Sequence, residues 1–276
     1  MTLRPSPPNS GIHFLRTDVD FDQAVIAASW RNIIESPLGT VLGNEHGVTI
    51  TAVEYLMAAL RICGVDNVLI EVSGEEVPEM ATGDISLVSL INGAGVSNQQ
   101  EPRFGIWIEQ PIEVRLAEQS ALLNPSTRPT FTAEIDLLGI NTIDTRYVSV
   151  PMLDHVFEQE IIPAPGSGPN DQLYRLREGH ELVDNPFSSD DNLVDDPLVD
   201  FVDELPVHMI LRNLGGLVLA EAPIFGHLFV NGLGHRLTHA LIREIYSQPE
   251  AWTRQSYKNI CQHCEYDQKE ASSRLH

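Results

Sequence analysis

The sequence has few cysteines, a shortage of positive charge and no long apolar run, and each shortage excludes a class of protein. Three cysteines among 276 residues cannot build the disulfide framework of a small secreted domain. Only 17 Lys and Arg stand against 39 Asp and Glu, and the net charge of −22 would repel nucleic acid. No run of 18 apolar residues is present and the N-terminus, MTLRPSPPNSG, lacks an apolar signal segment. We therefore expect a cytoplasmic protein with no membrane span and no nucleic-acid partner.

The composition is that of a folded chain with a sizeable core. Hydrophobic residues make up 42% of the sequence, and 276 residues suffice for one large or two ordinary domains. The pattern of hydrophobic and polar residues changes around residues 98–103. We expect a first domain over residues 1–98, a second over residues 103–250 and a polar C-terminal tail over residues 251–276.

Hydrophobic periodicity predicts strands and two helices in the first domain. The clearest helix is residues 49–63, where Thr51 and Glu54 have the spacing of a capping box and Gly64 ends the pattern. The other predicted elements are strands at residues 12–18 and 67–72, a loop over residues 39–47 and a helix at residues 84–93.

The second domain is also predicted to contain both strands and helices. A strand pair broken at Pro111 is predicted over residues 104–116. Further strands are predicted at residues 130–138, 146–150 and 224–230, with helices at residues 205–214, before Gly215-Gly216, and at residues 232–245. The fold class expected from these patterns is α+β.

Histidines are the main candidates for chemistry. His208 and Arg212 lie four residues apart on one predicted helix, and His235 and His239 form a second such pair after a glycine-rich turn. A lone histidine in such a setting is more often a packing or surface residue, but four histidines within residues 208–239 weaken that interpretation.

Two other segments have weaker functional readings. Residues 183–204 hold eight acids and no Lys or Arg, which favours a solvated loop over an ion-binding loop. Cys261 and Cys264 form a CxxC motif without a second ligand pair, so a zinc site there would have to be shared between two chains.

Several segments, taken in order along the chain, resemble one family. They are MTLRPSPPNSGIHFLRTD, LGNEHGVTITAVEYLMAAL, GVDNVLIEVSGEEVPEMATG, PVHMILRNLGGL and APIFGHLFVNGLGHRLTHALIREI. The chain is similar from residue 2 to about residue 246 to the bacterial UDP-3-O-acyl-N-acetylglucosamine deacetylases, which are zinc amidases of lipid A synthesis. The resemblance implies a two-domain sandwich of the ribosomal protein S5 domain 2-like type, in which each domain has a sheet and two helices and the helices pack between the sheets.

The resemblance also implies where a zinc site would lie. In the family, two His and one Asp hold zinc between the domains, and a Glu is the general base for the metal-bound water. The base is kept as Glu54, and one ligand is kept as His208. The other two ligand positions carry Tyr55, in place of His, and Arg212, in place of Asp.

Residues that help the family stabilise the oxyanion are only partly kept. The family's His is present as His235, but its Lys is replaced by Met209. Its Ala-Arg-Thr-Phe-Gly loop falls on Ala164–Gly168 without the Thr, and its Met-Asp-Gly-Ser turn has become Met80–Gly83. The family's first strand and Gly-Leu-His turn have no counterpart, so we expect a truncated start.

The exchange of Asp for Arg212 disfavours zinc for a physical reason. An arginine cannot lose its proton to become a ligand. Two unit charges about 4 Å apart interact by roughly 4 kcal/mol at an effective dielectric constant near 20, and zinc carries two charges. We therefore expect no cofactor, and expect Arg212 either to pair with Glu54 or, with His208, to bind an anionic ligand.

Three functions are consistent with these residues. The first is a paralogue that binds a small molecule, such as an acylated nucleotide sugar or another anion, in the old cleft without hydrolysing it. The second is an active amide hydrolase. Its site would be rebuilt with zinc on His208, His46 and His239, or would use Glu54, Tyr55 and His235 in metal-free acid–base chemistry. The third is an assembly protein whose acidic segment or CxxC motif contacts a protein partner.

Overall fold

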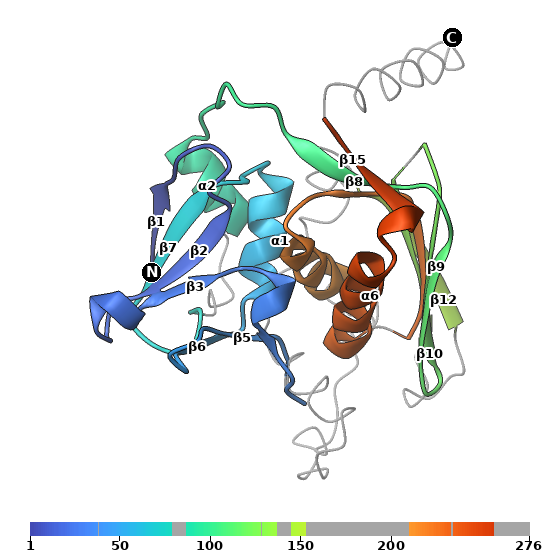
Figure 1. Cartoon of the computed structure of the whole chain (residues 1–276), viewed down its shortest axis with the longest axis horizontal. Coiled ribbons are helices and arrows are strands. Elements are labelled where there is room, and N and C mark those ends of the chain that lie inside the picture. The colour runs from blue at the N-terminus through green and yellow to red at the C-terminus, as the bar shows by residue number, and fades with distance from the viewer. Residues whose placement is uncertain are drawn as a thin grey trace, which may run out of the picture.

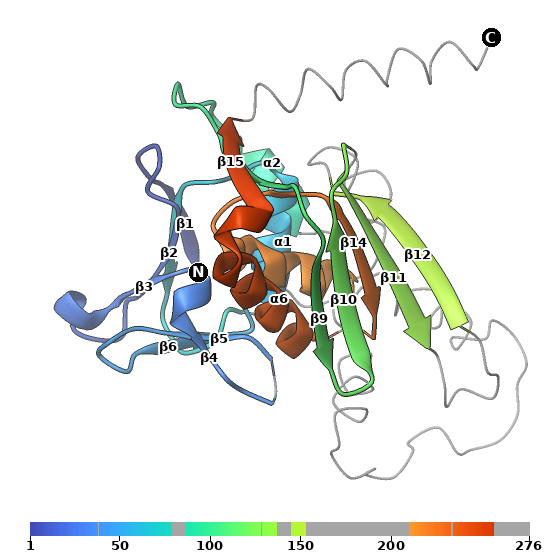
Figure 2. The same cartoon turned by 45° about the vertical axis from the view of Figure 1, so that its right-hand side comes forward.

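The chain folds as an α+β protein in which helices lie between separate sheets (Figures 1 and 2). The computed structural model describes residues 1–37, 39–78, 87–127, 129–136, 145–152, 210–232 and 234–256. For convenience, residues 1–98 are called the N-terminal half and residues 103–256 the C-terminal half. Within the described residues, no helix is long and apolar enough to cross a bilayer.

The N-terminal half contains two small sheets. Strands β1 (Thr2–Pro5), β2 (Ile12–Arg16), β3 (Val25–Ala27) and β7 (Val68–Val72) form one sheet in the order β1-β7-β2-β3. Strand β7 alternates between buried and half-buried residues, as its sequence predicts, and pairs in parallel with β2. A second sheet, β4-β5-β6, is made of Ile33–Ile34, Val41–Gly43 and Thr49–Thr51. The predicted loop over residues 39–47 is therefore wrong for β5.

Helix α1 (Glu54–Ile62) begins later than the sequence pattern suggests. Residues 49–51 are strand β6, and Ala52 turns the chain with a φ of 56°. The predicted capping box does not form, because Val53 is the N-cap and the Thr51 hydroxyl donates to the Glu75 carbonyl instead. The end of the helix at Gly64 is confirmed by its φ of 67°. A second helix, α2 (Leu87–Ala94), packs against α1.

The C-terminal half is built on a five-stranded sheet of order β12-β11-β14-β10-β9. Its strands are β9 (Ile112–Leu116), β10 (Gln119–Asn124), β11 (Thr130–Asp136), β12 (Thr145–Pro151) and β14 (His227–Asn231). A three-stranded sheet, β13-β8-β15, contains Ile224–Phe225, Phe104–Ile108 and Trp252–Ser256. Strand β15 lies in a segment that the sequence assigned to the polar tail.

Strands β8 and β9 do not form the pair predicted around Pro111. Strand β8 pairs with β13 and β15, whereas β9 pairs with β10. The backbone N–H groups of Glu109 and Gln110 donate to the Ala251 carbonyl at 2.8 and 3.1 Å. The chain therefore leaves one sheet before the proline, which has no N–H to donate, and joins the next sheet after it.

Two helices of the C-terminal half face α1 across the molecule. One covers residues 210–217, so it runs through Gly215 and Gly216 rather than ending before them. The other, α6 (His235–Ser247), confirms the last predicted helix and packs on β9 and β10. In Figure 1 the helix of residues 210–217, coloured orange, lies between α1 and α6, with the two large sheets on either side.

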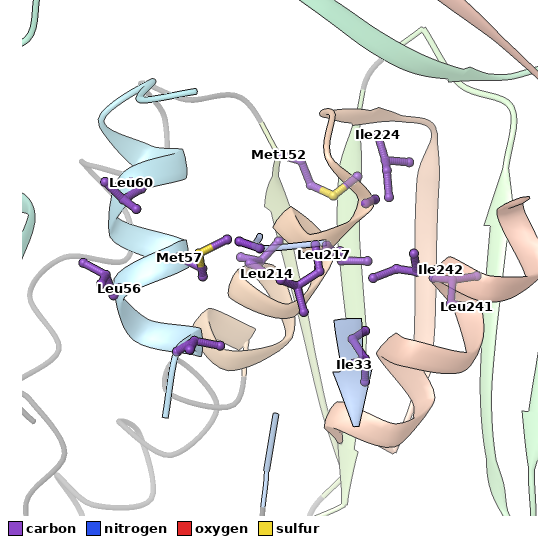
Figure 3. Packing of buried hydrophobic residues seen from close by; sticks show 14 of the residues in the cluster. Ile33, Leu56, Met57, Leu60, Met152, Leu214, Leu217, Ile224, Leu241 and Ile242 are labelled. Atoms are coloured by element: carbon purple, nitrogen blue, oxygen red, sulfur yellow. The ribbon is translucent and has the colours of Figure 1, made fainter. Parts of the chain in front are cut away.

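The core is continuous between the halves. Met57 of α1 points toward Leu214 and Leu217 of the facing helix, and Leu241 and Ile242 of α6 complete the layer (Figure 3). Met57 and Ile242 are fully buried. Each such side chain contributes about 1.5–3 kcal/mol to stability through burial, so the helices hold the two halves together.

Some predicted features lie outside the described residues. They are His208 and Met209, the acidic segment 183–204, the loop Ala164–Gly168, the turn Met80–Gly83, and the cysteines Cys261 and Cys264.

Candidate functional site between the two halves

Glu54 occupies the first turn of α1 and is 4% exposed. Its Oε1 atom accepts a hydrogen bond of 2.8 Å from the backbone N–H of Thr40. A carboxylate at this end of a helix is stabilised by the helix dipole. The strand-to-helix turn at Ala52 and Val53 thus delivers a buried carboxylate to the boundary between the halves.

Arg212, from the helix of residues 210–217, approaches the same carboxylate from the other half. Its Nη2 atom lies 4.0 Å from Glu54 Oε1, and the two side chains are 16% and 5% exposed. A Cβ atom placed on Gly39 would lie 3.5 Å from both of these atoms, so the backbone before Thr40 passes directly over the pair. Glu54 and Arg212 therefore form an ion pair between the halves, in a site that is largely closed to water.

Close helix packing sets the position of this pair. A Cβ atom on Gly215 would lie 1.9 Å from the carbonyl oxygen of Glu54, much closer than any real contact. Only glycine allows the helix of residues 210–217 to meet the first turn of α1 at this distance. The Gly215-Gly216 pair, which the sequence suggested as a helix end, is instead a contact point between helices.

Two histidines of α6 hold the segment that covers the ion pair. His239 Nε2 lies 3.1 Å from the Thr40 hydroxyl, and His235 Nε2 donates to the Ser36 carbonyl at 2.9 Å. An ion pair between Arg243 and Glu35 adds a third connection, and it holds the pKa of the Glu35 carboxyl below its usual value. Glu35, Ser36 and Thr40 are therefore tied to the C-terminal half by α6.

Burial changes the acid–base character of His239. The imidazole is 2% exposed, and its burial, together with the nearby His235, lowers its pKa to about 4. His239 is therefore neutral at pH 7 and can act there as a hydrogen-bond partner or a metal ligand, but not as a proton donor in its charged form.

The described residues beside Glu54 include no complete set of ligands for a catalytic zinc ion. Among the described residues no group of three His, Cys, Asp or Glu side chains could hold a metal. Tyr55 is half-buried next to Glu54, and Arg212 stands within 4.0 Å of the carboxylate as a permanent cation. A guanidinium in this position opposes the binding of a second cation.

The alternative zinc set of His208, His46 and His239 stays a prediction. His46 is exposed in the turn between β5 and β6, with Nε2 3.7 Å from Glu45 Oε1. His239 is buried and engaged with Thr40. His208 lies outside the described residues.

The structure brings together Glu54, Arg212, His235 and His239, all of which the sequence singled out. It adds Thr40 and Ser36, which sequence reasoning missed, because neither belongs to a motif. It also adds Asn213 and Thr238, whose side chains form a buried hydrogen bond of 2.8 Å beside the site. The result is a polar cluster whose members come from four separate segments.

Comparison with known proteins places the chain in a family. The family model described as LpxC, UDP-3-O-acyl N-acetylglycosamine deacetylase, matches residues 1–247. A UDP-3-O-acyl-N-acetylglucosamine deacetylase of Phenylobacterium zucineum is 33% identical over 91% of this chain and 87% of that protein. Proteins with the same name from Myxococcus xanthus and Idiomarina loihiensis are 30% and 31% identical over 91% of this chain, covering 81% and 84% of their own lengths.

Proposed function

Because the chain belongs to the UDP-3-O-acyl N-acetylglycosamine deacetylase family, we propose that it is a non-hydrolytic member that binds a ligand in the cleft between its halves. On this proposal the halves are the two domains of the family's sandwich, with the helices inside. The observation that carries it is the 4.0 Å approach of Arg212 Nη2 to Glu54 Oε1. The carboxylate that the resemblance assigns to the general base is engaged by a cation from the opposite half.

Two features of the pair support a loss of hydrolysis. Glu54 also accepts the Thr40 N–H, and only 5% of its side chain is exposed, which leaves little access for an attacking water. A general base must lie within hydrogen-bond reach of the proton that it removes. The site thus supports pairing between the halves better than it supports water activation.

The ligand we propose is an acylated nucleotide sugar or a related anion. The relatives are named for action on a UDP-linked acyl amino sugar, and the diphosphate of such a molecule is anionic. Arg212 retains 16% exposure of its side chain, and a guanidinium binds phosphate oxygens in a bidentate manner.

The test restores the family's zinc-ligand types in the full chain. Zinc content is measured by elemental analysis for the wild type, for Tyr55→His and Arg212→Asp, and for the double variant that restores the family's donor types. We expect no stoichiometric zinc in the wild type, and a gain only in the double variant. Zinc bound by the wild type and lost in His208→Ala would overturn the proposal.

Ligand binding is measured separately, by calorimetry with UDP-N-acetylglucosamine and its 3-O-acyl derivative. We expect binding without hydrolysis in the wild type, and weaker binding in Arg212→Gln. Arg115→Gln, at an exposed position of strand β9, is the matched control and should bind as the wild type does. Hydrolysis of the acylated compound by the wild type would contradict the proposal directly.

One observation favours a second candidate, an amide hydrolase with a rebuilt site. Glu54 and His239 both contact Thr40, the His235 ring lies 5.6 Å from that of His239, and the charge of Glu54 acts on the pKa of His239. Such a cluster can move protons. If the chain releases acyl groups from the acylated nucleotide sugar, Glu54→Gln and His235→Gln should each abolish that activity, with urea unfolding used to show that each variant is folded.

A further inference from the structure

A hollow separate from the Glu54–Arg212 pair lies between the two halves, beside the second half of α1. It is a cavity of about 460 Å³, lined by residues of both halves and by the linker at residues 101–104. Neither Glu54 nor Arg212 lines it, and neither do His235 and His239. Its volume falls within the range of cavities that hold small organic molecules.

One wall of the cavity is apolar. It is formed by the inner helices and the strand ends next to them: Ala58, Ile62, Met152, Leu214, Leu217 and Ile224. Figure 3 shows the last four of these gathered beside the helix of residues 210–217. All six are buried in the folded chain. An apolar group that enters the cavity would therefore be removed from water on this side.

Three arginines from separate segments, here called the rim, also line the cavity. Arg61 comes from the last turn of α1, Arg103 from the linker and Arg254 from β15. The guanidinium of Arg254 lies 4.7 Å from the ring centre of Phe104, which fixes it at the rim by a cation–π contact.

Three acids, Asp66, Glu101 and Glu221, also line the cavity, and two of them are paired with arginines. Asp66 is paired with Arg103 at 2.6 Å, and Glu221 is paired with Arg31 at 3.1 Å. Arg254 forms no ion pair with any residue in the described part of the chain. A cation without an ionic partner in the described residues, beside apolar side chains, is a favourable place for an anion.

We propose that this cavity binds a small organic anion with an apolar body, held by its head group at Arg254 and Arg61. A carboxylate and a phosphate monoester both suit a guanidinium, because each can accept two parallel hydrogen bonds. The apolar body lies against Leu214 and Leu217. The site is independent of the Glu54–Arg212 pair and does not require the proposed function of that pair.

The binding test uses four probes with the full chain in isothermal titration calorimetry: decanoate, decyl phosphate, 1-decanol and inorganic phosphate. We expect saturable binding of one decanoate or one decyl phosphate per chain, and at least about 10-fold weaker binding of 1-decanol and of phosphate alone. The stronger of the two anions identifies the head group. Absence of saturable binding by both would overturn the proposal.

Variants locate the ligand. The double variant Arg61→Gln/Arg254→Gln should weaken binding of the anion by at least about 10-fold. The control Arg115→Gln and the variant Arg212→Gln, which changes the Glu54–Arg212 pair, should leave it unchanged. Ala27→Leu, at a half-buried position of the cavity wall, should weaken binding by filling the space. Unfolding midpoints in urea show that each variant is folded. Wild-type affinity in both the double arginine variant and Ala27→Leu would place the ligand elsewhere and refute the assignment.

Discussion

The two ends of α1 face the C-terminal half in opposite ways. At its first turn, Glu54 is buried and its carboxylate is matched by Thr40 and Arg212. In its second half, Ala58, Arg61 and Ile62 line a cavity that has an arginine rim. The first end is a polar cluster with its partners inside the chain, whereas the second has space and charge for an outside partner. The difference suggests that stability is concentrated at one end and ligand recognition at the other.

The largest effect is expected at Gly215, where the helix of residues 210–217 contacts the first turn of α1. A side chain at this position must displace the backbone of Glu54, so Gly215→Ala should cost more than about 3 kcal/mol in free energy of unfolding. Urea unfolding measures the loss. The control is Gly93→Ala in α2, where a Cβ meets nothing within 4 Å, and helix propensity should make that variant more stable by up to about 1 kcal/mol. Equal stability of the two variants would contradict the close helix contact.

The next effect is a dependence of stability on pH that comes from His239. Its pKa falls from 6.5 in the unfolded chain to about 4 in the folded chain, so the unfolded state binds the proton more tightly. Stability is therefore fully present above pH 6.5 and is lost as pH falls toward 4, by about 3 kcal/mol in all.

Urea unfolding between pH 7.5 and pH 4 measures this slope. His239→Gln should flatten it, whereas His46→Gln, at an exposed turn, should leave it as in the wild type. An unchanged slope in His239→Gln would show that the imidazole is not held neutral by burial.

The ion pair itself gives a smaller effect. Arg212→Gln leaves the buried carboxylate of Glu54 without its cation and should cost about 2 kcal/mol in free energy of unfolding. In a Glu54→Gln background the same change should cost much less, because no charge is left to compensate. A double-mutant cycle measured in urea gives the coupling. A coupling energy near zero would mean that the two side chains do not interact.

The smallest effect is expected at the rim of the cavity. Arg254 is exposed, so Arg254→Gln should change the free energy of unfolding by less than about 0.5 kcal/mol. Thermal unfolding is measured without ligand and with decanoate. In Arg254→Gln the midpoint without ligand should stay close to that of the wild type, whereas the increase of the midpoint caused by decanoate should be smaller. A large loss of stability without ligand would assign Arg254 to the framework rather than to a binding site.

Elements with a clear hydrophobic period were predictable from the sequence, and very short strands without one were not. Strand β7 and helix α6 follow their patterns because one face of each is buried. Strand β4 contains only two residues, and two residues cannot show a period. The start of α1 was missed because the φ of 56° at Ala52 has no signal in the sequence.

The sequence by itself determined the chemical inventory of the site. Tyr55 and Arg212 stand at positions where the family resemblance places zinc ligands, and no folding of the chain can make a ligand of a guanidinium. Only the tertiary structure decided how these groups are used. It places Thr40 against His239, 199 residues away, and Arg212 against Glu54. The physical reason is that such partners meet through the packing of helices on Gly215 and on the shared core, and local periodicity carries no information about contacts between distant segments.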